Sequence, residues 1–173
     1  MKINCNSNQS YSSLAKWLHW SFVILFAYGI YKQVGELNEL EDLSLLKFEI
    51  VFAFIFLLFL AFRFVYMTKT QNSSLPENTS KAQKIAAKLV HLSMYFCLFG
   101  IVLSGLMIGF LYWFGVKGGY LIEFSIFIHE SFFSIIYWLI SLHVIASIYH
   151  RFKQDGVWNS MVPFLKENKT QNN

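Results

Sequence analysis

Four long apolar segments constrain this chain more than any other feature of its sequence. They cover residues 17–31, 48–64, 90–114 and 127–149. With their flanks included, each approaches the roughly 20 residues that an α-helix needs to cross about 30 Å of hydrocarbon. The composition agrees, because 55% of the 173 residues are hydrophobic and only 14% are charged. The sequence therefore predicts an all-α integral membrane protein, a four-helix bundle.

The expected organisation is a single membrane domain over residues 1–173. Transmembrane helices are predicted at about 14–34, 45–66, 85–112 and 127–150, with a polar loop at 67–84 and a loose tail at 165–173. The first segment resembles a secretory signal in length, but mostly polar residues precede it and no small-residue cleavage pattern follows Tyr31. We therefore expect it to stay in the mature protein.

The distribution of Lys and Arg predicts the orientation, because these residues concentrate on the cytoplasmic side of membrane proteins. With both termini cytoplasmic, that side carries Lys2, Lys16, Arg63, Lys69, Lys81, Lys84, Lys88, Arg151, Lys153, Lys166 and Lys169. The other side carries Lys32, Lys47 and Lys117, together with Glu36, Glu39, Glu41, Asp42, Glu49, Glu123 and Glu130. An N-in, C-in protein of the bacterial cytoplasmic (inner) membrane is predicted.

The two cysteines favour neither a disulfide nor covalent haem attachment. Cys5 lies in the N-terminal tail and Cys97 lies within the third apolar segment. A reducing compartment keeps both as thiols. The sequence has no C-x-x-C-H run, which excludes c-type haem attachment of the usual kind.

Two histidines of the fourth segment, His129 and His143, are fourteen residues apart. On an α-helix this spacing is about 21 Å and returns to nearly the same face. Ionisable residues at membrane depth need a partner inside the protein, and metals are common partners of neutral imidazole. The spacing indicates two stacked cofactors, although two structural histidines with hydrogen-bond partners are the alternative.

His19 lies at the depth of His143 if both termini are on one side. A six-coordinate b-type haem takes two axial ligands from opposed helices, and a filled coordination sphere suits electron transfer. We therefore predict His19 and His143 as the inner iron ligands. The alternative is that each hydrogen-bonds a neighbour.

At the outer position, His129 needs a second iron ligand, and no other histidine lies at that level. Glu49 on the second segment lies at this level, but carboxylates match a b-type haem poorly. Met107 on the third segment is a possible axial partner, or a core-filling side chain. Both assignments of the outer iron ligand stay open.

Further side chains are candidates for cofactor contact. His91 and His150 stand at the inner rim, either as rim residues that reach the interface or beside haem propionates or a quinone headgroup. Arg63, Arg151, Trp20 and Tyr95 could assist there, Arg through its bidentate contact with carboxylates. The series Gly100, Gly105 and Gly109 provides either a helix-packing surface or a flat seat for a macrocycle.

Several motifs together resemble the bacterial cytochrome b561 family, which is related to the cytochrome b subunits of nickel hydrogenases. The likeness covers residues 14–163. Its motifs are Trp17-Leu-His19-Trp20; Ala87-Lys-Leu-Val-His91-Leu-Ser-Met-Tyr95 with Ser104-Gly105; and His129-Glu130, His143 and His150-Arg151-Phe-Lys153, followed by Asp155 and Met161.

The resemblance implies a four-helix membrane cytochrome with two b haems that exchanges electrons with quinones. In the family, the first and fourth helices ligate the inner haem, and the second and fourth helices ligate the outer one. The family's second-helix ligand is a histidine fourteen positions before an arginine, and counting back from Arg63 gives Glu49. The resemblance therefore implies haem b at the inner site, while Glu49 departs from the pattern at the outer site.

The predicted function is a membrane-bound b-type cytochrome that relays electrons to or from a membrane quinone. One alternative is a non-catalytic cytochrome or anchor subunit of a larger oxidoreductase partner. Another is a superoxide:quinone oxidoreductase, which a branch of the family implies. The acidic outer face argues against superoxide, because clustered negative charge repels an anion. No nucleic-acid partner is expected.

Overall fold

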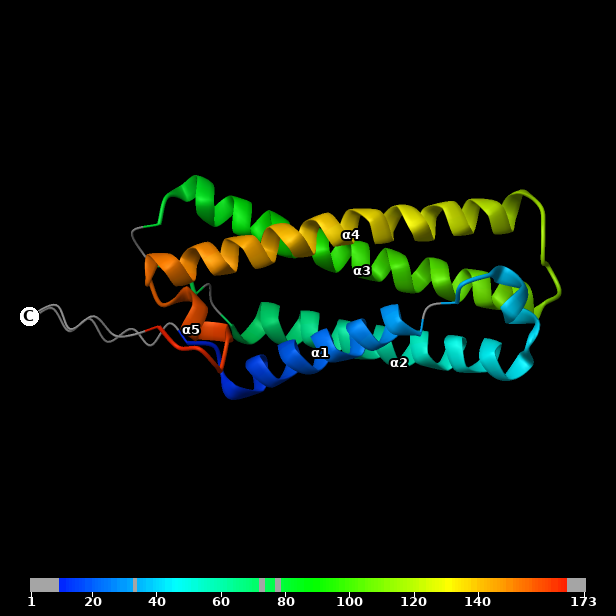
Figure 1. The fold of residues 1–173 in the computed structure, drawn as a ribbon, viewed down its shortest axis with the longest axis horizontal. Coiled ribbons are helices and arrows are strands. Elements are labelled where there is room, and N and C mark those ends of the chain that lie inside the picture. Colours follow the sequence, from blue (N-terminus) through cyan, green and yellow to red (C-terminus); the bar gives the residue numbers. More distant parts are fainter. Residues whose placement is uncertain (1–9, 33, 72–73, 77–78, 168–173) are drawn as a thin grey trace, which may run out of the picture.

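The computed structural model of the protein describes residues 10–32, 34–71, 74–76 and 79–167, which form a bundle of four long helices (Figure 1). Lys2, Cys5, Lys169 and the tail beyond residue 167, which entered the predictions above, lie outside the described residues. The elements in chain order are α1 (Ser13–Tyr31), the 3₁₀ helix η1 (Leu37–Glu41), α2 (Leu43–Thr70), α3 (Lys81–Trp113), α4 (Tyr120–Lys153) and α5 (Val157–Met161).

All four long helices are long and apolar enough to cross a membrane. No strand occurs among the residues that the structure describes. The chain is therefore an all-α, multi-pass membrane protein, as the four apolar segments predict.

The bundle has two distinct ends (Figure 1). α5 lies at one end, beside the start of α1 and the connection between α2 and α3. At the opposite end lie η1 and the connection between α3 and α4. We call these the α5 end and the η1 end. The α5 end corresponds to the predicted cytoplasmic side.

The helix ends differ from the predicted ones because polar turns extend the helices beyond the apolar segments. α2 continues to Thr70 and α3 begins at Lys81, so the connection is shorter than the predicted loop at 67–84. Ser80 fixes the start of α3, since its Oγ accepts a hydrogen bond from the Gln83 amide at 3.3 Å. α4 begins at Tyr120, directly after Gly119, whose φ of 95° suits glycine.

Asp42 starts α2 in the same way. Its carboxylate accepts hydrogen bonds from the amide and the hydroxyl of Ser44, both at 2.8 Å. Both contacts hold the pKa of the Asp42 carboxyl below its usual value, and the contact with the hydroxyl has the larger effect. The negative charge therefore stays at the N-terminus of α2, where the helix dipole favours it.

α3 is the centre of the bundle. It packs against α4 and α2, whereas α1 packs chiefly on α2. In an apolar stretch of 18 consecutive residues, 44% of the residues are buried in α3 but only 6% in α4. The outward faces of the other helices are therefore available to lipid. The buried core consists of Phe22, Phe56, Leu60, Cys97, Leu98, Ile101, Val102, Leu106 and Ile136.

The glycine series on α3 consists of helix-packing positions. A Cβ on Gly100 would lie 2.3 Å from the ring of Phe132 on α4, and one on Gly109 would lie 2.8 Å from Ile50 on α2. These contacts need a residue without a side chain. The packing interpretation of the glycines, rather than the macrocycle seat, describes the contacts that they make.

Candidate functional site

Three histidines from three helices meet near the α5 end. His19 of α1 and His143 of α4 have ring centroids 6.5 Å apart, with an interplanar angle of 58°. His91 of α3 lies edge-on to His143, with centroids 5.0 Å apart. The predicted pair is thus brought together across the bundle, and His91 joins it from the side.

The separation of His19 and His143 matches two imidazoles on opposite sides of one iron. A metal–imidazole bond is about 2 Å long and the ring centroid lies roughly 1 Å beyond the nitrogen, so two axial rings have centroids roughly 6 Å apart. The observed 6.5 Å fits this arrangement. The 5.0 Å between His91 and His143 is too short for it. In donor chemistry and spacing, His19 and His143 therefore fit a haem iron.

Arg63 of α2 lies beside this pair, and not all of its N–H groups have a hydrogen-bond partner. Its Nη2 donates to Nδ1 of His19 at 3.0 Å, and its Nη1 donates to the Tyr95 hydroxyl at 2.7 Å. Its Nε is buried without a hydrogen-bond partner. No carboxylate among the described residues lies within ion-pair distance of Arg63. A permanently charged guanidinium in this position is suited to an anionic group.

The contact between Arg63 and His19 has a consequence for ligation. Because Arg63 donates to Nδ1, the neutral His19 ring carries its proton on Nε2. Ligation through Nε2 would require that proton to move to Nδ1, which could then no longer accept a hydrogen bond from Arg63. Arg63 then has two groups to offer to another acceptor, such as the carboxylate of a haem propionate.

His91 is held in the opposite tautomer. Its Nδ1–H donates to the Ala87 carbonyl at 2.7 Å, one turn earlier in α3. Its Nε2 therefore carries a lone pair. His91 offers a hydrogen-bond acceptor next to the pair of His19 and His143.

The C-terminal segment covers this end of the bundle. The Trp20 indole donates to the Met161 carbonyl at 3.2 Å, and its ring contacts Phe164 with centroids 5.4 Å apart. The Gly156 amide donates to the Glu167 carboxylate at 2.9 Å. Glu167, predicted to be part of a loose tail, thus contacts the segment around α5.

His150 and Arg151 also contact this segment. The His150 Nδ1–H donates to Asp155 at 2.7 Å, and Lys153 lies 3.4 Å from the same carboxylate oxygen. The Arg151 guanidinium lies 5.1 Å from the centroid of the Trp158 ring. The structure therefore places both residues among the contacts that hold α5.

His129 occupies the second level, towards the η1 end. Its Nδ1 lies 2.9 Å from the Ser104 hydroxyl of α3. The hydroxyl donates to the Gly100 carbonyl at 2.6 Å, so it accepts from His129 Nδ1–H and leaves a lone pair on Nε2. The ring lies against Gly105, where a Cβ would be 3.1 Å from its Cε1.

Glu49 is the residue of α2 at this level. It precedes Arg63 by fourteen residues, just as His129 precedes His143. Its side chain is half-buried and its Oε1 is buried without a hydrogen-bond partner. The other four histidines are His19, His91, His143 and His150, all towards the α5 end.

Met107, the other candidate, lies on the outside of α3. It is 43% exposed and follows the same stripe as Phe96, Leu103 and Phe110, which are exposed too. The η1-end level thus offers one histidine and one carboxyl group. These residues do not fit a bis-histidine haem.

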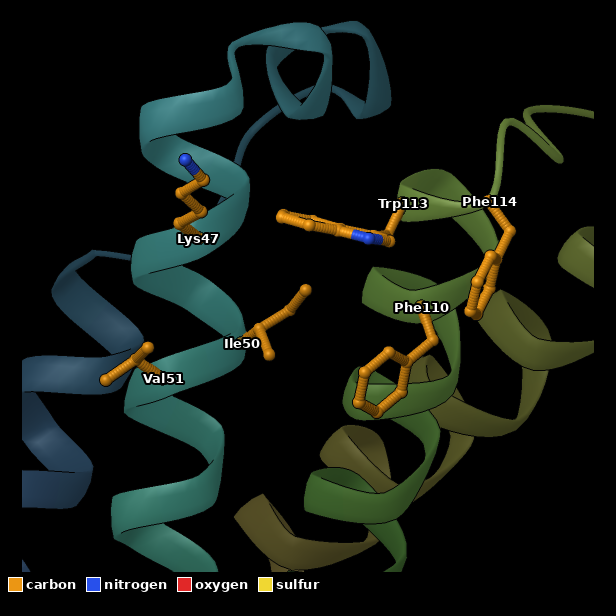
Figure 2. A pocket seen from close by; sticks show the side chains of 6 residues that line it. All are labelled: Lys47, Ile50, Val51, Phe110, Trp113 and Phe114. Atoms are coloured by element: carbon orange, nitrogen blue, oxygen red, sulfur yellow. The ribbon is translucent and has the colours of Figure 1, made fainter.

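An open apolar groove lies elsewhere, between α2 and α3 at the η1 end. Figure 2 shows Lys47, Ile50 and Val51 of α2 on one side, and Phe110 and Trp113 of α3 with Phe114, directly after it, on the other. Lys47 Nζ lies 6.0 Å from the Trp113 ring centroid. None of the five histidines lines this groove.

Ser104 is the contact residue whose role the sequence analysis did not identify. It entered only as part of a motif, yet it fixes the orientation of His129. Its position next to Gly105 was the available signal, because a hydroxyl beside a glycine can receive a close ring from the next helix.

A family model described as prokaryotic cytochrome b561 matches residues 10–164. No match was found among curated proteins or among solved structures.

Proposed function

The chain belongs to the prokaryotic cytochrome b561 family, and from this membership we propose that it relays electrons to or from a membrane quinone through a haem held by His19 and His143. The observation that carries the proposal is the 6.5 Å separation of these two rings, which come from α1 and α4. When bound, haem b supplies an iron that accepts and releases one electron.

The two imidazoles have a defined task in this proposal. Together they would hold the haem from two sides of the bundle, and the bound haem would supply one-electron chemistry. Their placement on two helices sets the orientation of the ligands before an electron arrives.

Arg63 and its neighbours serve the anionic edge of the cofactor. We assign the guanidinium to a haem propionate, because its Nε has no partner and its Nη2, which now contacts His19 Nδ1, would become available if His19 held the haem. Tyr95 positions Arg63 through their 2.7 Å hydrogen bond. His91, with a lone pair next to His143, is assigned to a group at the quinone-exchange edge.

Trp20 and His150 are assigned supporting roles at the same edge. Both bind the C-terminal segment, Trp20 through the Met161 carbonyl and His150 through Asp155. They limit the access of water to the histidine cluster by holding this segment over it. Contact with the cofactor itself is proposed for Trp20, whose ring lies edge-on to His19 at 5.7 Å.

We also propose that the α5 end faces the cytoplasm. This orientation is supported by the described basic residues at that end, Lys16, Arg63, Lys69, Lys81, Lys84, Lys88, Arg151, Lys153 and Lys166. The η1 end carries Lys32, Lys47 and Lys117. The bias follows the rule that cytoplasmic loops are rich in Lys and Arg.

A His143→Ala variant tests the assignment. Purified wild-type protein should give a pyridine haemochrome signal for haem b and a low-spin spectrum, and the variant should lose the low-spin signal. Ser141→Ala is a matched control, because Ser141 donates only to the Tyr137 carbonyl of its own helix. A low-spin spectrum retained by His143→Ala refutes the pairing with His19.

Quinol-driven reduction tests the partner. We expect a soluble quinol analogue to reduce the haem of the purified chain in the absence of other proteins. If the analogue has no effect while a chemical reductant works, quinone exchange by this chain is refuted and a partner subunit becomes the electron donor.

A further inference from the structure

The η1-end half of the bundle differs from the α5-end half in what it can hold. We infer that the chain carries a single haem, at the α5 end, and that Glu49 and His129 leave the η1-end level without one. This inference rests on the proposed function, since it takes the haem between His19 and His143 as given.

The same fourteen-residue spacing on α2 and on α4 allows the two levels to be compared directly. Moving from Arg63 to Glu49 and from His143 to His129 covers about 21 Å on each helix and returns to nearly the same face. At the first level, His143 has His19 at 6.5 Å. At the second level, His129 is the only histidine and α2 contributes a carboxyl group.

The donors of the η1-end level are unsuited to a low-spin b-type haem. Such a haem takes His or Met as axial ligands, and a carboxylate prefers harder cations. Glu49 Oε1 is buried with no hydrogen-bond partner, so it forms no built ligand set with other side chains. Met107 lies on the exposed stripe of α3 and is 43% exposed.

At the η1-end level the helices pack directly against one another. His129 lies against the backbone of α3 at Gly105, and Ile50, next to Glu49, lies against Gly109. Phe52 lies 3.1 Å from the Cβ position of Gly29 near the end of α1. Direct contacts thus join α3 to α4, α2 to α3, and α1 to α2 in this half.

A single haem limits the distance over which the chain can transfer an electron. Electron tunnelling slows exponentially with distance, and the two levels are about 21 Å apart along the helices. Without a second iron, the chain has no stepping point between the histidine cluster and the η1 end. The partners of the haem are then confined to the α5 end and the membrane beside it.

The ratio of haem to protein tests this inference. We expect purified wild-type chain to contain one haem, and Glu49→His to approach two, with a second low-spin signal in electron paramagnetic resonance. Glu130→His is the control, because it adds a histidine next to His129 on the exposed side of α4 and should stay at one. His129→Ala should also keep one haem.

The outcomes separate the two proposals. Two haems in the wild type, loss of haem in His129→Ala, or a Glu49→His variant that folds and stays at one haem each overturn this inference while the proposed function stands. A wild-type protein without haem overturns the proposed function itself. If Glu49→His does not fold, the wild-type ratio and His129→Ala still decide the question.

Discussion

Replacing Gly100 by alanine should destabilise the contact between α3 and α4. A Cβ at this position would lie 2.3, 2.5 and 2.6 Å from three atoms of the Phe132 ring. Carbon atoms in favourable contact are about 3.5–4.0 Å apart, so the ring would have to move by more than about 1 Å. The ring also packs edge-on against Phe96, with centroids 5.7 Å apart, which restricts its retreat.

Two opposing effects set the magnitude. Overpacking of this kind costs about 1–3 kcal/mol, whereas alanine gains roughly 1 kcal/mol over glycine in helix propensity. The three simultaneous overlaps place Gly100→Ala in the upper part of the range, for a net loss of about 1–2 kcal/mol. For a chain of this size, that loss lowers Tm by roughly 2–8 °C.

The other helical glycines provide a graded comparison. At Gly29 the nearest contact is 3.1 Å, to the far end of the Phe52 ring, so alanine there should be neutral or stabilising. Gly109, at 2.8 Å from Ile50, should fall between Gly29 and Gly100. Thermal melts in detergent, followed by tryptophan fluorescence, measure all three.

The result that refutes this reasoning is a Gly100→Ala variant that melts at or above the wild type. A second substitution provides an internal check. Phe132→Leu removes the ring that the new Cβ would meet, so it should recover much of the Tm lost in Gly100→Ala. No recovery would mean that the loss arises elsewhere.

Three smaller predictions concern individual contacts. Ser104→Ala removes the 2.9 Å contact with His129 and should lower the stability measured in thermal melts by about 1 kcal/mol. Ser134→Ala, which loses only a hydrogen bond within α4, should lower it less. Equal losses of stability would contradict the role given to Ser104. Trp20→Phe keeps an aromatic ring but removes the donor to Met161, so limited proteolysis should cut after Lys153 faster than in the wild type; an unchanged rate would show that this hydrogen bond does not hold the segment. Lys117→Gln breaks an exposed 3.0 Å ion pair with Glu41 and should change stability by less than about 1 kcal/mol; a larger loss in the same melts would refute the view that this pair is weak.

The membrane-spanning helices could be predicted because hydrophobicity over some 20 residues is a strong signal. Their ends could not, because the polar turns at Lys81 and Lys69 lie in helices but outside the apolar segments. α5 was missed for another reason. It has five residues, too few for a helix to form alone, and distant contacts such as that of Trp20 with Met161 hold it.

The histidine pair was predictable from depth alone. Helix order places His19 and His143 at one level, and the 6.5 Å separation agrees with that expectation. The approach of His91 to His143 was not predictable, because it depends on how α3 is rotated about its axis. The bond between Ser104 and His129 depends on the same rotation together with the close packing at Gly105. The family membership inferred from the motifs was confirmed.

The two imidazoles that lie 6.5 Å apart come from the first and the last membrane-spanning helix. A chain that enters the membrane from its N-terminus delivers α1 long before α4 has been synthesised. His19 can contact Arg63 of α2 early, but it lacks the second histidine, His143, until α4 has been translated, and α1 rests chiefly on α2 in the meantime. Under the proposed ligation, haem capture would report completed biosynthesis, and a truncated chain that ends before α4 would insert into the membrane but stay colourless.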